Sequence, residues 1–426
     1  MSVGFYLLGR FETAQLQPDD LLRHLENWIE RESSDLSPIT RLGFVDEKPC
    51  LFSLFHPAAE EVEICLTDPD HVTVSANTST VGPGYHIFLC DLIRRWSDDF
   101  SIKWIEFSAD DDTTFGDEAD YFFSRDKQKV YDQMAHWLRT LTGSFFDGTL
   151  DQNSKDIALC MPMNVQFEGN SLAITQLGPR DKDWLFRLSK GLIADHEFFP
   201  WHNIGLTAEY YLGRALVHMW SDVRWRRPAN DNERRLLRSV VTSLETACRI
   251  NPDLVFPWND WNELLDFLEE KGSTFDFVGA RVSGPGRIGY RRNRVRTCLP
   301  GNWWIETEGS FSEFESDETG ALCSFDPPRE IWFTAYSFSA DNPKENFRRI
   351  RNTALGEKHE FTHEDDTYVS VADISKKVKE GMPYYVLQSS CIGLLRRCVC
   401  TLVFDKADDR EWAIRVWRSL KPSKAK

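Results

Sequence analysis

The sequence predicts a multidomain α+β protein, and three observations lead to this class. The chain has 426 residues, which is too long for one ordinary hydrophobic core. Its content of 41% hydrophobic and 27% charged residues is that of a globular protein. Short strand-like runs dominate both ends, and helical periodicity dominates the middle. We expect an N-terminal α/β domain over residues 1–147, a mainly helical domain over 156–272 and a C-terminal antiparallel sheet covered by helices over 293–422.

The N-terminal domain interleaves predicted strands and helices. Apolar residues at helical spacing predict helices over 18–31, 85–96 and 124–141. Alternating or short apolar runs predict strands at 3–8, 42–45, 50–54, 61–66, 72–75 and 103–107. The first run is short and has no basic leader, so we expect a strand there rather than a signal peptide.

The middle domain is predicted to be mainly helical. Two short strands, at 157–165 and 172–177, precede the helical part. Helical spacing then predicts four helices, at 182–193, 206–220, 232–250 and 258–271.

The C-terminal region reads as strands with one helix in their midst and one at the end. The predicted strands are 295–299, 303–308, 322–325, 330–336, 368–376, 384–392 and 396–404. The predicted helices are 343–354 and 411–420. Antiparallel strands in this order imply a sheet with helices on one face.

Three segments of this region resemble the PsbP-like family of α/β sandwich domains. They are Leu299-Pro-Gly-Asn-Trp, Ile331-Trp-Phe-Thr-Ala-Tyr and Glu411-Trp-Ala-Ile-Arg-Val-Trp-Arg-Ser-Leu. The resemblance covers roughly the last 130 residues. It implies a fold and a role in binding or assembling other proteins, and it implies no activity because the family shares no catalytic triad.

The net charge indicates which classes of partner to expect, and the cysteines indicate the cellular compartment. The net charge of −17 disfavours nucleic acid and anionic membranes and favours a basic protein partner. The ten cysteines include no Cys-x-x-Cys pair and lie mostly in apolar runs, which predicts free buried thiols in a reducing compartment and no zinc site. No apolar run reaches the roughly 18–20 residues that span a bilayer. We therefore expect a cytoplasmic protein.

The turn Val81-Gly-Pro-Gly-Tyr-His is the first candidate binding site. Gly82 and Gly84 would let backbone N–H groups approach an anion at a helix N-terminus, beside Tyr85 and the proton-carrying His86. The spacing matches neither a phosphate loop nor a dinucleotide fingerprint. The alternative is a tight strand-to-helix turn in which Pro83 fixes φ.

A cluster of arginines is the second candidate site. Its members are Arg281, Arg287, Arg291, Arg292, Arg294 and Arg296. We take Arg287, Arg291 and Arg292 as the binding candidates, because guanidinium groups hold phosphate or carboxylate in bidentate fashion. The alternative is neutralisation by the many Asp and Glu of this chain.

Metal and catalytic motifs are not found in the sequence. The acidic loop 110–120 lacks calcium-loop spacing, so a solvated loop is expected. His196, His202 and His218 form no His-Glu-x-x-His signature. There is no Gly-x-Ser-x-Gly elbow. We expect no metal and no cofactor.

The sequence therefore favours a cytoplasmic, non-enzymatic protein-interaction protein that covers a basic partner. An immunity or defence-associated role is the concrete form of this hypothesis. The alternative is a hydrolase or phosphate-handling enzyme that uses the Gly82–His86 turn with carboxylates near 110–112. A third hypothesis is a homo-oligomer that associates through exposed tryptophans.

Overall fold

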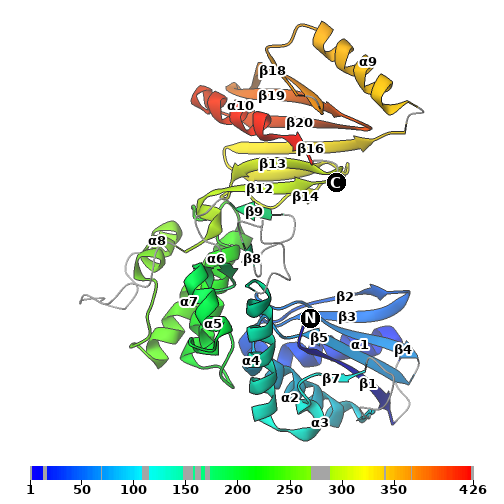
Figure 1. Ribbon diagram of the computed structural model, residues 1–426, viewed down its shortest axis with the longest axis vertical. Coiled ribbons are helices and arrows are strands. Elements are labelled where there is room, and N and C mark those ends of the chain that lie inside the picture. The colour runs from blue at the N-terminus through cyan, green and yellow to red at the C-terminus, as the bar shows by residue number, and fades with distance from the viewer. Residues whose placement is uncertain are drawn as a thin grey trace. The chain divides into compact units, whose positions relative to one another are not determined.

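The chain forms two compact units. The computed structural model describes residues 2–12, 17–68, 70–107, 115–146, 157–158, 165–167, 173–269, 288–339, 342–365 and 367–423 (Figure 1). The first unit comprises Met1–Met161, Asn170–Asp222 and Leu236–Ile288. The second comprises Pro162–Gly169, Val223–Arg235 and Gly289–Lys426. The predicted α+β class is confirmed, with an N-terminal antiparallel sheet, a helical middle and a C-terminal seven-stranded antiparallel sheet.

An antiparallel sheet organises the first unit. Its strands are β1 (Gly4–Phe11), β2 (Ile39–Val45), β3 (Lys48–Leu54), β4 (Val62–Asp68), β5 (His71–Asn77), β6 (Ile102–Trp104) and β7 (Gly116–Asp117). The order is β2-β3-β4-β5-β1-β6, and β7 pairs with β1. Leu51, Ile64, Val74 and Leu7 are paired across four neighbouring strands and are all buried. This row forms the sheet side of the core, since alternate residues of a strand share one face.

Helices cover that row. They are α1 (Pro18–Glu32), α2 (Pro83–Phe100), α3 (Tyr121–Ser124) and α4 (Lys127–Ser144). The apolar face predicted for the first helix is buried in α1, including Leu22, Leu25 and Trp28. Helix α2 begins at Pro83, directly after Gly82 with φ of +119°, and ends at Phe100, which Ser101 follows in the left-handed region. Its buried face includes Leu89 and Leu92, which join the same core.

The helical middle belongs to the first unit over most of its length. Its helices are α5 (Lys182–Ser189), α6 (Ala208–Ser221), α7 (Asp231–Ile250) and α8 (Trp258–Leu268). A small sheet precedes them, formed by β8 (Ile157–Ala158), β10 (Ala173–Thr175) and β11 (Gly178–Arg180). Phe199, Trp201 and Tyr210 pack into the core of the N-terminal sheet. The three predicted domain boundaries stay a prediction.

Two sheets and two helices build the second unit. The larger sheet has the order β14 (Glu315–Ser316), β15 (Leu322–Asp326), β16 (Arg329–Ser337), β20 (Arg396–Phe404), β19 (Met382–Gly393), β18 (Tyr368–Lys379) and β17 (Phe361–Glu364). The smaller has the order β21 (Lys421–Pro422), β13 (Trp303–Glu308), β12 (Arg294–Leu299) and β9 (Val165–Phe167). Helix α10 (Arg410–Ser419) supplies Trp412, Val416 and Trp417 to a core shared with both sheets. Helix α9 (Pro343–Gly356) contributes Ala354 to a separate cluster on β18 and β19.

The prediction of free thiols is wrong for two of the cysteines. Cys50 of β3 and Cys65 of β4 are directly opposite each other, with Cα atoms 4.1 Å apart, and form a disulfide. The pairing depends on strand register, which spacing along the chain does not reveal. The remaining described cysteines are free: Cys90, Cys248, Cys298, Cys323, Cys391, Cys398 and Cys400. Within the described ranges, no helix is both long and apolar enough to cross a bilayer.

Candidate functional site

The Gly82–His86 turn lies inside the first unit. Gly82, Gly84, Tyr85 and His86 are all buried. The Gly84 N–H donates to the carbonyl of Trp201 at 3.1 Å. A Cβ atom on Gly84 would clash with the backbone of the segment that follows Trp201, so the glycine permits a close approach of two backbones. These contacts favour the packing alternative, and ligand binding by the turn stays a prediction.

His86 is held between two side chains. Its Nδ1 lies 2.9 Å from the Thr78 hydroxyl, and its Nε2 lies 3.1 Å from Asp117 Oδ1. The Asp117 carboxylate also accepts backbone N–H groups from Ala119 at 2.9 Å and from Tyr121 and Phe122 at 2.8 Å each. One buried carboxylate thus joins β7, α3 and the start of α2.

The pKa of Asp117 records this network. Burial acts to raise the pKa of the carboxyl, but His86 and the backbone N–H groups of Phe122 and Ala119 outweigh it and hold the pKa below the ordinary value. The carboxylate is therefore ionised in the folded protein at neutral pH.

Cys90 stands next to this pair and completes a set of metal-ligand types. One ligand atom each from His86, Cys90 and Asp117 lies within 4.8 Å of the others. Burial and the Asp117 charge raise the pKa of the Cys90 thiol well above its ordinary value. Both His86 nitrogens already face protein partners. The contacts of His86 and Asp117 make this set a structural hub of the first unit.

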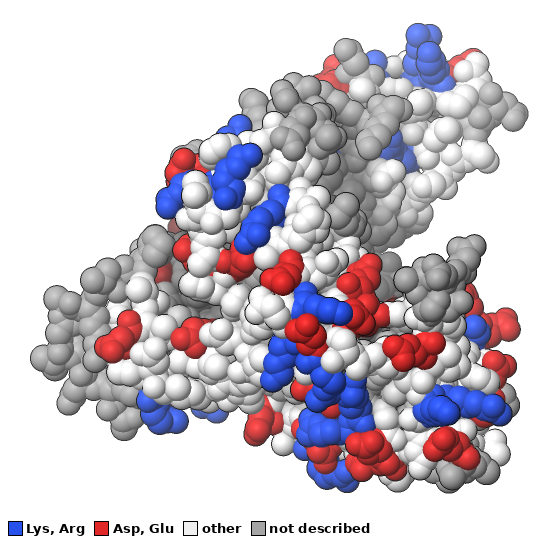
Figure 2. Space-filling view, turned by 60° about the horizontal axis from the view of Figure 1, so that its bottom comes forward, with Lys and Arg blue, Asp and Glu red and all other residues white. Residues whose placement is uncertain are grey.

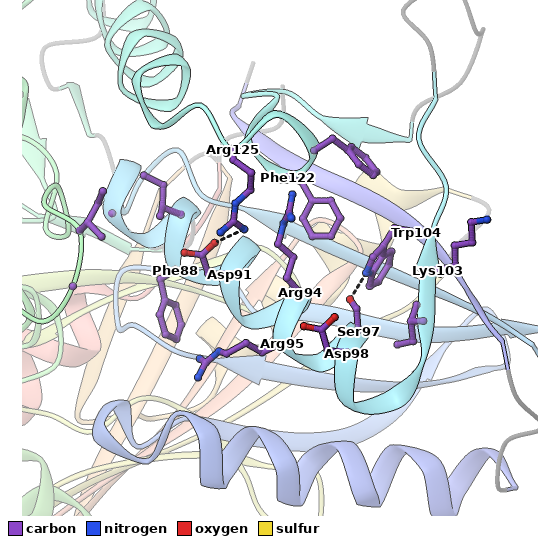
Figure 3. Close-up of a pocket in the computed structure, with 16 residues that line it drawn as sticks. Phe88, Asp91, Arg94, Arg95, Ser97, Asp98, Lys103, Trp104, Phe122 and Arg125 are labelled. Atoms are coloured by element: carbon purple, nitrogen blue, oxygen red, sulfur yellow. Dashed lines mark hydrogen bonds and ion pairs between the residues drawn. The ribbon is translucent and has the colours of Figure 1, made fainter.

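A large open groove runs along α2. This α2 groove has a volume of about 1040 Å³. Its charged lining residues are Asp91, Arg94, Arg95, Asp98, Lys103 and Arg125 (Figure 3). Its aromatic lining residues are Phe88, Trp104, Phe122 and Phe123. Of the predicted turn residues, only Gly84 reaches its wall.

The sequence analysis missed the α2 groove. In the space-filling view, Lys and Arg side chains gather among Asp and Glu on the side of the first unit that carries α2 and α3 (Figure 2). The available signal was the pair Arg94-Arg95 inside an amphipathic helix of an acidic chain. That signal alone does not say that Lys103 and Arg125 come to the same place.

The arginine cluster lies in the second unit. Arg291 is buried and donates through Nη2 to Glu313 Oε1 at 2.6 Å. The guanidinium of Arg292 lies 3.3 Å from the ring centre of Trp225. These contacts support the alternative of internal neutralisation. Arg281 and Arg287 lie outside the described residues.

Arg224, which the sequence analysis did not include, also belongs to this cluster. Arg224 lies 3.6 Å from the same carboxylate of Glu313. Burial, together with the charge of Arg291, lowers the pKa of Arg224 to about 10. Two guanidinium groups therefore converge on one carboxylate, which lies at the surface.

All three guanidinium nitrogens of neighbouring Arg226 have partners within the protein. It makes a two-point ion pair with Glu233, with distances of 2.7 and 2.9 Å. Its Nε lies 3.0 Å from both Asp326 Oδ1 and the carbonyl of Ser310. All three charged side chains are mostly buried, so this network holds the fold of the second unit.

The predicted acidic loop is only partly described. Residues 110–112, to which the enzyme hypothesis assigned carboxylates, lie outside the described residues. Of the rest, Asp117 contacts His86 as described above, Glu118 accepts the Gly4 N–H at 2.7 Å, and Asp120 pairs with Lys129. These three carboxylates of the loop are thus engaged in contacts within the protein.

The three histidines of the middle domain also have protein contacts. His202 Nδ1 lies 3.2 Å from the Asn203 side chain, and His218 Nδ1 lies 2.7 Å from Asp222. His196 packs edge to face against His202. The three histidines are thus held by hydrogen bonds and ring packing within the protein.

The edge strand β2 presents apolar side chains to solvent. Ile39, Leu42 and Phe44 are 68%, 41% and 72% exposed. Strand β2 ends the sheet and, among the described strands, pairs only with β3. We call this surface the β2 edge.

Comparison with known proteins identifies no family. No family model matches the sequence, and no curated protein matches it. Among solved structures there is a distant match to a crystal structure from Bacteroides thetaiotaomicron VPI-5482, with 16% identity and a TM-score of 0.25. It covers 30% of this chain and 48% of that chain, so this protein spans about half the length of its match.

Proposed function

We propose that this protein is a non-enzymatic protein-interaction protein and that the β2 edge is its docking surface. The observation that carries the proposal is the exposure of Phe44, Ile39 and Leu42 on an edge strand. Soluble proteins usually protect such edges with charges, bulges or covering loops, since an open edge templates pairing with another chain. An edge strand that exposes apolar side chains offers a surface for partner binding by strand addition.

The surroundings of the β2 edge specify the chemistry of the partner. Glu26 and Glu30 of α1 lie beside it, where the Thr40 hydroxyl is 3.0 and 3.4 Å from their carboxylates. Asp46 and Glu47 are exposed in the turn that ends the strand. The cation of Arg41 is neutralised by Glu61. The edge therefore favours an extended segment with apolar residues flanked by Lys or Arg.

The sequence-based expectations fit this proposal. An acidic protein that covers a basic partner suits an immunity or defence-associated role, and a PsbP-like C-terminal fold would add a second protein-binding scaffold. A cytoplasmic location belongs to the same proposal. Trapping thiols with an alkylating agent before lysis would establish whether Cys50 and Cys65 are paired in cells.

Affinity capture with two matched variants tests the proposal. Phe44→Lys adds a cation to the β2 edge, and Val378→Lys makes the same change at a residue of β18 that is 67% exposed. We expect wild type and Val378→Lys to retain one basic partner at fixed stoichiometry from native lysate, and Phe44→Lys to lose it. Retention of that partner by Phe44→Lys, or capture of none by wild type, would refute the proposal.

Light scattering of the purified protein separates a foreign partner from a second copy. We expect a monomer at all concentrations. A dimer that forms with rising concentration and disappears in Phe44→Lys would instead assign the β2 edge to self-association.

A further inference from the structure

We infer that the α2 groove is a binding site for a small organic anion, in which a carboxylate or phosphate group is attached to a planar ring. The inference does not depend on the β2 edge. It rests on an excess of cations in the groove, on one arginine that forms no ion pair with any described residue, and on an ordered aromatic wall.

The groove has the opposite charge balance to the chain. Four cationic residues line it, Arg94, Arg95, Lys103 and Arg125, against two carboxylates, Asp91 and Asp98. The chain as a whole has a net charge of −17. A concave site with low-dielectric walls concentrates this local field, so small anions are drawn to it.

Arg94 is the central residue. Its guanidinium lies 5.0 Å from the ring centre of Phe122, and its Nε is covered without a hydrogen bond to any residue that the structure describes. In the described part of the chain it forms no ion pair, although it projects from α2 between Arg125 and Phe122 (Figure 3). The side chain of Arg94 is half-buried and lines the groove, so the terminal N–H groups of its guanidinium can donate to a bound carboxylate or phosphate.

Arg125 is fixed but only partly neutralised. Its Nη1 lies 2.9 Å from Asp91 Oδ1, and the same oxygen accepts the hydroxyl of Tyr121 at 3.1 Å. The single carboxylate is thus shared by two donors. Burial is the main cause that lowers the pKa of Arg94, and the positive charge of Arg125 lowers it further. A ligand anion between Arg94 and Arg125 would relieve this repulsion.

Aromatic rings form the wall beside the cations. The Trp104 indole N–H donates to the Ser97 hydroxyl, which fixes the ring (Figure 3). Trp104 and Phe122 meet edge to face at 5.6 Å, and Phe123 meets Phe122 in the same way at 5.1 Å. Rings held in this manner can stack on a planar group. The groove is also at the upper end of the usual range of ligand-site volumes, roughly 300–1000 Å³, so it can take more than an inorganic ion.

Calorimetric titration of the full chain tests the inference with four probes. Adenosine monophosphate and benzoate each combine a ring with an anion, whereas adenosine lacks the charge and inorganic phosphate lacks the ring. We expect at least one ring-bearing anion to bind at least tenfold more tightly than both adenosine and phosphate. The better of the two probes distinguishes a phosphate ester from a carboxylate. Equal affinity of all four probes, or no binding at millimolar concentration, would overturn the inference.

Three variants locate the site. Arg94→Gln should weaken the ring-bearing anion at least tenfold, while Arg139→Gln, which removes an α4 cation paired with Asp195 outside the groove, should not. Since Arg94 also covers Phe122, its variant could lose stability. Asp98→Lys avoids that problem, because Asp98 is exposed on the groove and should tighten binding several-fold when its charge is reversed. Unchanged affinity in Asp98→Lys, or an equal loss in Arg139→Gln, would contradict the assignment.

Discussion

Replacing Asp117 with Ala should open the region around α3 and the start of α2. The carboxylate accepts backbone N–H groups from Ala119, Tyr121 and Phe122 and faces His86 at 3.1 Å. Ala would leave these donors buried and unpaired. Each hydrogen bond to a charged group contributes about 1.5–3 kcal/mol, but such terms do not add fully. Breaking one buried charge network typically costs about 3–5 kcal/mol, which we take as the expected loss.

Hydrogen exchange measured by mass spectrometry reports this loss directly. A loss of about 3–5 kcal/mol corresponds to roughly 100- to 5000-fold faster exchange of the amides in the peptide over residues 116–124. Peptides from α10 in the second unit provide the internal control, and their exchange should not change. Asp117→Asn keeps one acceptor oxygen, so its effect should be intermediate. Unchanged exchange over residues 116–124 in Asp117→Ala would refute the role of the carboxylate as a hub.

The same hub predicts a pH dependence. The pKa of Asp117 is lowered in the folded state, so the unfolded state takes up its proton first as the pH falls. The stabilisation that the ionised Asp117 provides is therefore complete above the ordinary aspartate pKa of about 3.9. It is lost as the pH drops through the lower pKa of the folded state. The difference in exchange between wild type and Asp117→Asn should be constant from neutral pH down to about 5 and shrink below about 3.9.

Two further predictions concern the packing of each unit. Arg226→Ala should lower the free energy of unfolding of the second unit by about 3–5 kcal/mol in urea titration, because Glu233 and Asp326 lose their buried cation; a loss below about 1 kcal/mol would show a solvated surface network. Gly84→Ala should destabilise the first unit by more than about 1 kcal/mol in thermal melts, since its Cβ would strike the backbone at Asn203. An unshifted melting temperature would reopen the turn as a ligand site.

Local patterns were sufficient to predict most helices of the first unit and the strands at 42–45 and 50–54. Leu22, Leu25 and Trp28 repeat at helical spacing, and they form the buried face of α1. The strands predicted at 42–45 and 50–54 belong to β2 and β3, which pair as a hairpin with two turn residues of positive φ. Such features depend on neighbours within one or two turns of chain, so the sequence contains the necessary information.

The predicted sites depended on information of another kind. The sequence of the Gly82–His86 turn does not reveal Trp201, which packs on the turn from more than a hundred residues away. The arginine cluster was predicted without Arg224, which comes from the segment before α7 and meets Arg291 only in the folded second unit. In both cases the missing residue is remote in sequence.

By itself, the sequence of this protein determined the α+β class, most helix and strand positions and the acidic character of the chain. The tertiary structure alone decided which cysteines are opposite each other, that His86 faces Asp117, and that Arg94 and Arg125 share a groove with Trp104. The physical reason is range. Helix and turn formation follow from short-range periodicity and backbone sterics, whereas sites arise where strand register and core packing bring distant side chains within a few ångströms.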